Sequence, residues 1–286
     1  MSLPPLQRLP AELLVLIYNS LPRIKDAVSL SLTCKKTHVL FERFEDRTSI
    51  IYSIVDTIPT SLPTTYPARS WAEEYFPRGT PFWNPAANEI PKELQHEDTL
   101  AFIKSTGFPV FECERLDFSS RVLEPAPPRI RNVDGALPAP KRREDDTLER
   151  SSSGDDGEEC ETEDSDSDSD GEIQWKEPLY LGTWFSQNVA VDSATGKIQR
   201  RGWEDDEESE DIAENVGRFL VLLAVIRSVM CDLQICGLDR FRKEQVERDE
   251  EVEEVVLEKL FDGLGAVDVL VREAPFWGWI CNYLTP

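Results

Sequence analysis

Hydrophobic residues recur at helical spacing in residues 11–21, close to the start of the chain. The stripe consists of Leu13, Leu14, Ile17 and Leu21. Pro10 precedes this stripe and suits the first turn of a helix, where the backbone N–H has no intrahelical partner. Pro22 follows it and disfavours the helical conformation at the preceding residue. Further apolar residues lie beside the stripe, so we predict a helix that must be covered on more than one side.

Two more short helices are expected directly after the first. Ile24, Val28 and Leu32 are spaced four residues apart, and residues 35–44 continue the helical pattern. Three short helices within about 35 residues cannot bury a core large enough to be stable alone. Part of their apolar surface should therefore contact the rest of the chain or a partner.

The middle of the chain gives weaker signals. Residues 48–56 are a β-branched run that fits either a strand or a continuation of the third helix. Between residues 59 and 91 prolines recur among aromatic residues, which indicates a packed but irregular region. A helix is predicted within 92–107, and one or two short strands within 110–122.

The second half begins with a segment that has little to bury. Residues 134–174 are rich in Gly, Pro, Ser and acids and predict a disordered acidic linker. Residues 175–199 alternate as a β-hairpin does, with Val189 and Val191 on its far arm and a further turn after that arm at 192–196. Two helices are predicted from about 209 to 236 and from 239 to 261, forming a helical hairpin with a buried first arm. The expected fold class is mainly α with minor β structure, and the tail after residue 266 is too apolar to remain unpacked.

The charge of the chain is confined to short segments. Of a net charge of −24, residues 144–172 contribute fifteen acids against one base, and residues 204–214 contribute eight acids and no base. The remainder is close to neutral and has no basic footprint, so nucleic-acid binding is not expected. The apolar run 219–226 is too short to span a membrane.

Six cysteines are widely spaced and no signal peptide precedes them, which favours a reducing intracellular location, cytoplasmic and/or nuclear. The two histidines lack a nucleophile or metal-ligand spacing, and phosphate-loop and hydrolase motifs are missing from the sequence. We therefore expect a non-catalytic protein without a metal or cofactor. Trp277 and Trp279 fit either a recognition pocket or a core.

Three serines in the predicted linker each have an acid three residues further on. They are Ser165, Ser167 and Ser169, and the pattern is similar to the acidic sites used by casein kinase two. Phosphorylation would deepen the charge of a segment that already repels itself, so it would alter partner affinity more than fold. An unmodified acidic spacer is the alternative.

One ordered motif resembles a known family. It is Leu9-Pro10-x-Glu12-Leu13-Leu14-x-x-Ile17-x-x-x-Leu21-Pro22, then Asp26, then Leu30-Ser31-Leu32-Thr33-Cys34-Lys35. This motif resembles the F-box, most closely its filamentous-fungal form, a three-helix module over roughly residues 1–45. It departs from the family at Ala27, where a larger aliphatic residue is usual, and at Thr37-His38, where many members carry Arg-Trp or a similar pair.

The resemblance implies a substrate-recognition adaptor of a Skp–cullin–F-box ubiquitin ligase. The residues implied to dock on the Skp-family adaptor, and through it on a cullin, are Leu9, Pro10, Leu13, Leu14, Ile17, Leu21, Pro22, Leu30 and Leu32. The rest of the chain would hold a protein substrate, with 46–133 as a packed region, 134–174 as a linker, and 175–286 as a C-terminal region that stands alone or forms one domain with 46–133.

Two alternatives stay open from the sequence. The first is an F-box-containing binding or scaffold protein that acts outside a ubiquitin ligase. The second is an N-terminal helical hairpin that merely packs on its own domain, in which case removal of residues 1–45 destabilises the remainder.

Overall fold

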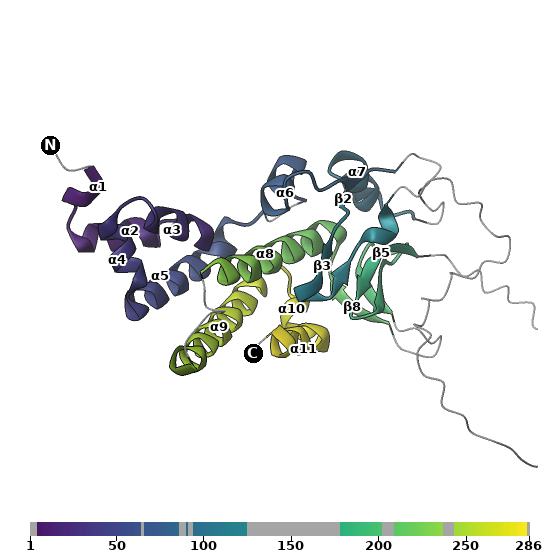
Figure 1. Cartoon of the computed structure of the whole chain (residues 1–286). Helices are drawn as coiled ribbons and strands as arrows, with labels where there is room; N and C mark the ends of the chain where they lie inside the picture. The colour runs from purple at the N-terminus through teal and green to yellow at the C-terminus, as the bar shows by residue number, and fades with distance from the viewer. Residues whose placement is uncertain are drawn as a thin grey trace, which may run out of the picture. The chain divides into compact units, whose positions relative to one another are not determined.

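Helices account for most of the residues that the structure describes, with a smaller antiparallel sheet, as the sequence predicts (Figure 1). The computed structural model describes residues 5–63, 66–85, 90, 94–124, 178–201, 209–236 and 243–284. The predicted linker 134–174 and its three serines lie outside these residues. Everything described below belongs to one unit formed by residues 1–125 and 176–286. The division of the chain into four parts stays a prediction.

Five helices form the N-terminal part. Their bounds are α1 Pro5–Arg8, α2 Ala11–Asn19, α3 Ile24–Ser31, α4 Lys35–Glu42 and α5 Phe44–Thr57. Residues 48–56, which fit a strand or a helix from sequence, belong to α5. The helical choice follows from burial, since Ile50, Ile51, Ile54 and Val55 all enter the core and this spacing places them on one helix face. Arg43 is extended and separates α4 from α5.

The proline-rich middle has more regular structure than its composition indicates. It contains η1 Ile58–Ser61, α6 Arg69–Tyr75, β1 Phe82–Trp83, α7 Glu97–Ser105 and β2 Phe108–Pro109. Strands β1 and β2 pair with each other as a separate two-stranded sheet. Helix α7 lies within the predicted range 92–107, and His96 caps it by accepting a hydrogen bond from the backbone N–H of Thr99.

A six-stranded antiparallel sheet follows the order β3-β4-β5-β6-β7-β8. Its strands are β3 Glu112–Cys113, β4 Phe118–Ser119, β5 Leu179–Trp184, β6 Gln187–Val191, β7 Ile198–Arg201 and β8 Glu210–Ala213. Short 3-10 turns η2 Glu114–Leu116 and η3 Arg121–Leu123 flank β4. The predicted hairpin is confirmed as the β5–β6 pair, but the sheet extends beyond it on both sides.

The predicted helix start at about residue 209 is wrong. Residues 210–213 form β8 instead, because its acids pair with bases on β7 and just before it: Glu210 forms an ion pair with Arg200 at 2.9 Å, and Asp211 forms one with Lys197 at 2.7 Å. The helix begins only at residue 216, where Asn215 caps it.

Helix α8 Val216–Ile235 is the most buried element, and residues 219–226 are at most 1% exposed. It contacts α3, α6, α7, α9 and β8. Helix α9 Lys243–Leu264 extends three residues beyond the predicted end at residue 261. Two further helices follow it, α10 Leu270–Glu273 and α11 Pro275–Leu284. The buried first arm of the predicted helical hairpin is thus confirmed. A single hydrophobic core includes residues from α2 to α11.

Candidate docking surface

Helix α2 has one face inside the core and another at the surface. Leu14 and Tyr18 are fully buried, and the Tyr18 hydroxyl donates a hydrogen bond to the carbonyl oxygen of Thr37 at 3.1 Å. The Tyr18 ring stacks on Phe41, with centroids 5.6 Å apart, and burial raises the pKa of Tyr18 to about 12. Leu13 and Leu16, on the outer face, stay 45% and 63% exposed. The buried pair therefore orients the exposed pair.

The start of helix α4 is fixed by a capping box between Cys34 and Thr37. The Thr37 hydroxyl accepts a hydrogen bond from the Cys34 backbone N–H at 3.3 Å and lies 3.4 Å from its thiol sulfur. The hydrogen bond with this hydroxyl lowers the pKa of the Cys34 thiol. This anchored start presents Val39, which is 45% exposed, on the outer side of α4.

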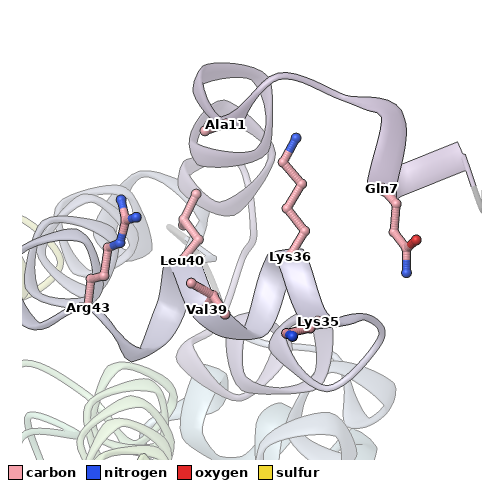
Figure 2. Close-up of a pocket in the computed structure, with 7 residues that line it drawn as sticks. All are labelled: Gln7, Ala11, Lys35, Lys36, Val39, Leu40 and Arg43. Carbon is pink, nitrogen blue, oxygen red and sulfur yellow. The ribbon is translucent and has the colours of Figure 1, made fainter.

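A hollow of about 490 Å³ lies between α1, α2 and α4 (Figure 2). The residues that line it are Gln7, Ala11, Lys35, Lys36, Val39, Leu40 and Arg43. Lys36 extends from α4 toward the α1–α2 connection, where its ammonium group donates a hydrogen bond to the carbonyl of Leu9. The hollow is therefore lined by a polar contact on one side and by the mostly buried Leu40.

The charge on this hollow is positive, although the whole chain carries −24. Its lining includes three bases and no acid. The Arg43 guanidinium lies 3.8 Å from the Asp46 carboxylate, and both side chains are exposed. Exposed ion pairs of this kind are weak, so most of the positive charge of Arg43 remains available to a partner. An apolar floor with a basic rim suits a partner that offers both apolar side chains and carboxylates.

The nine residues that carry the predicted adaptor contact fall into three groups. Pro10, Leu13, Pro22 and Leu32 are exposed, and Leu9, Ile17, Leu21 and Leu30 are half-buried. Leu14 alone is fully buried, so it can support the surface only from inside. Sequence reasoning did not select Leu16, Val39 or the bases of the hollow, because the stripe pattern does not show which side of a helix its neighbours cover.

A second hollow of about 570 Å³ lies where α3, α6 and α8 meet. Its polar groups are used to join these elements. The Asp232 carboxylate of α8 accepts a hydrogen bond from the Lys25 backbone N–H at 3.1 Å, and burial raises the pKa of Asp232. The Arg227 guanidinium of α8 donates to the carbonyl of Tyr75 at 3.0 Å. This hollow is therefore a structural junction between the N-terminal helices and α8.

The histidine and cysteine side chains described next have structural roles. His96 packs against the turn at Gly196, where an added Cβ would lie 2.3 Å from its Nδ1 atom. Across the described ranges, no three His, Cys, Asp or Glu side chains gather as metal ligands do. Burial raises the pKa of the Cys236 thiol to about 12, so this thiol is unreactive at neutral pH.

The two tryptophans near the C-terminus have different roles. Trp277 is 1% exposed and its indole N–H donates to the carbonyl of Ile212 at 2.7 Å, so it belongs to the core. Trp279 is 45% exposed on the other side of α11.

Among the described helices none has the length and apolar character that crossing a membrane requires. The chain matches no family model, no curated protein and no solved structure.

Proposed function

We propose that this chain is a non-catalytic substrate adaptor of a Skp–cullin–F-box ubiquitin ligase. One observation carries the proposal: the motif that resembles the F-box folds into α2, α3 and α4, and Leu13, Leu16, Leu32 after the end of α3, and Val39 are left exposed there. Several large apolar side chains exposed within one short motif favour a protein contact. Once bound to the Skp-family adaptor, this chain would hold its substrate close to the ligase and so raise the local concentration of that substrate.

The basic hollow adds a second reason to assign this side to a partner. Lys35, Lys36 and Arg43 line it together with apolar side chains, whereas most of the chain's charge is acidic. Bases around an apolar floor favour an acidic, partly apolar partner over an uncharged one.

The test is co-purification of the full-length chain with a Skp-family adaptor. Leu9→Ala/Pro10→Ala removes the start of the motif, and Leu13→Asp/Leu16→Asp places charges on the exposed face without entering the core. Val122→Asp is the matched control, because Val122 is 59% exposed in a different part of the chain. We expect the wild type and the control to bind, and both double variants to lose binding. A wild-type chain that does not bind the adaptor refutes the proposal.

A binding or scaffold protein outside a ligase is the second candidate. A protein of this kind would make the same contact with the Skp-family adaptor. The cellular lifetime of the proteins that it binds would, however, stay the same when the chain is removed. Partner lifetimes that lengthen on its removal support the ligase role.

A further inference from the structure

Two arginines from distant parts of the chain meet at the end of α6, in the hollow of about 570 Å³ between α3, α6 and α8 (Figure 1). The Arg23 guanidinium donates a hydrogen bond to the carbonyl of Glu74 at 3.3 Å, and the Arg227 guanidinium donates to the next carbonyl, that of Tyr75, at 3.0 Å. Each planar group also lies over a ring: Arg23 is 5.7 Å from the ring centroid of Tyr75, and Arg227 is 6.0 Å from that of Phe76. Both guanidinium groups are therefore held in place before any ligand arrives.

These contacts use only part of what each arginine offers. A guanidinium group carries five N–H donors, and a carbonyl acceptor leaves its positive charge in place. Arg227 has no ion pair within the described ranges. Arg23 lies 3.6 Å from the carboxylate of Asp26, but both side chains are partly exposed, so this pair is weak. Both arginines thus keep donors and charge for a ligand in the hollow.

Two further bases, Lys25 and Arg78, line the same hollow. Among the residues that the structure describes, neither of these side chains forms a hydrogen bond or an ion pair. The Lys25 ammonium acts on the buried Asp232 carboxylate through its charge alone. A ligand can therefore approach both bases without breaking a contact that holds the fold together.

The balance of charge around the hollow is slightly positive. The acids of its lining are Glu73, Glu74 and Asp232. Glu73 is paired with Arg69 at 2.9 Å, and neither Arg69 nor the Asp26 partner of Arg23 belongs to the lining. With these two outside partners included, five bases face four acids, which leaves one positive charge. A ligand with a single negative charge matches this surplus, whereas a dianion or a polyanion exceeds it.

The rest of the lining suits an apolar group attached to that charge. Tyr75, Phe76 and Pro77 contribute from the end of α6, and Ile235, which is 60% exposed, contributes from the end of α8. The volume of about 570 Å³ falls within the range of roughly 300 to 1,000 Å³ that is usual for ligand sites. Among singly charged anions, a carboxylate fits arginine best because its two oxygens match the fork of N–H donors.

We propose that this hollow binds a carboxylate group carried by an apolar body. Arg23 and Arg227 bind the two oxygens, Lys25 and Arg78 add charge from the rim, and the apolar side chains contact the body. Two sources share this chemistry: a small carboxylic acid, and the free C-terminus of another protein that ends in an apolar residue. Carboxylate binding itself does not depend on the proposed function. Only the use of such a C-terminus to select a ubiquitination substrate rests on it.

The test is isothermal titration calorimetry of the full-length chain with the peptide acetyl-Gly-Ser-Gly-Phe, either with a free C-terminal carboxylate or as the amide. We expect the free acid to bind at least about tenfold more tightly, because the amide lacks the charge and the second acceptor. Phenylpropionate has the same aromatic body without the peptide. Equal affinity for phenylpropionate supports the proposal with a small acid as the source, and tighter binding of the peptide supports it with a protein C-terminus.

Variants of the lining separate recognition from folding. Lys25→Ala and Arg78→Ala should each weaken binding of the free acid about threefold, with little change in melting temperature. Arg227→Lys keeps the charge but loses the fork and should weaken binding about tenfold. Lys104→Ala is the matched control, since Lys104 is an exposed base of α7 outside the hollow, and it should leave the affinity unchanged.

Three results would overturn the proposal. Equal affinity for the acid and the amide, or an equal loss in Lys104→Ala and Lys25→Ala, would show that neither the carboxylate nor the hollow is recognised. Tighter binding of phenyl phosphate than of phenylpropionate would contradict the match to a single charge. A wild-type chain that binds none of these compounds would show that the arginines serve only to join α3, α6 and α8.

The outcome is distinguishable from that of the adaptor test. Leu13→Asp/Leu16→Asp should leave carboxylate binding unchanged, because neither leucine lines this hollow. Carboxylate binding without adaptor binding would keep the site and remove only its link to ubiquitination. Adaptor binding without carboxylate binding would remove the site and leave the proposed function intact.

Discussion

Two leucines on the same helix should differ strongly in how much stability the chain loses when each is replaced by alanine. Leu14 and Leu16 are two residues apart on α2, but Leu14 is fully buried and Leu16 is 63% exposed. Removal of a buried leucine side chain leaves a cavity and typically costs about 2 to 5 kcal/mol, whereas a surface truncation usually stays within about 0.5 kcal/mol. For a domain of this size, the loss at Leu14 corresponds to a fall in melting temperature of roughly 4 to 20 °C.

Urea denaturation of Leu14→Ala and Leu16→Ala, followed by circular dichroism, measures this difference directly. We expect a lower midpoint for the buried variant and an unchanged midpoint for the exposed one. Adaptor co-purification should show the reverse pattern below the unfolding temperature, with a larger loss at Leu16. Equal destabilisation by the two variants would refute the assignment of the inner and outer faces of α2, and with it the geometry of the docking surface.

Three further changes test other parts of the fold. Burial raises the pKa of Asp232 above its ordinary 3.8, so the folded state holds this proton more tightly and the group's contribution to stability falls as the pH rises through the raised pKa. The stability of Asp232→Asn relative to wild type should therefore increase as the pH rises above about 4, and a difference that is constant with pH would contradict this. Gly182→Ala should destabilise the sheet by about 1 to 3 kcal/mol, because a Cβ there would lie 2.3 Å from the carbonyl oxygen of Ser119; an unchanged urea midpoint would show that the β4–β5 approach is looser. Asn215→Ala removes the acceptor for the Arg218 N–H at 2.9 Å and should cost about 1 kcal/mol, whereas Asn215→Ser should retain most of the stability.

The helical part of the fold was largely predictable because its boundaries are local. Pro10 and Pro22 bracket α2, and the predicted range 11–21 exceeds the observed helix by only two residues. Strand β8 was not predictable in this way. Its acids resemble the first turn of a helix in sequence. Only their pairing with Arg200 of β7 and with Lys197 just before β7, 10 and 14 residues away in the sequence, makes them fit a strand.

The candidate surface was predictable as a segment but not as a set of side chains. A stripe at helical spacing locates α2, but its position relative to the core is decided by contacts such as Tyr18 with Thr37 and Phe41. These partners lie about twenty residues away, so Leu14 and Leu16 cannot be sorted into core and surface from α2 alone. The contact of Phe185 with Trp279 and Tyr283 was even less predictable, because it joins a turn and a helix that are far apart in the chain.

The contact between α3 and α8 changes how the role of the N-terminal helices can be tested. Ile24 and Ala27 of α3 are at most 1% exposed, and the neighbouring Lys25 N–H satisfies the buried Asp232. Deleting residues 1–45 would expose the apolar side chains of α8 that α3 covers, which is costly whether or not the helices also bind an adaptor. Destabilisation after the deletion therefore cannot separate a docking module from a structural hairpin. Charge substitutions at Leu13 and Leu16 can, because they alter the outer face and leave the α3–α8 junction intact.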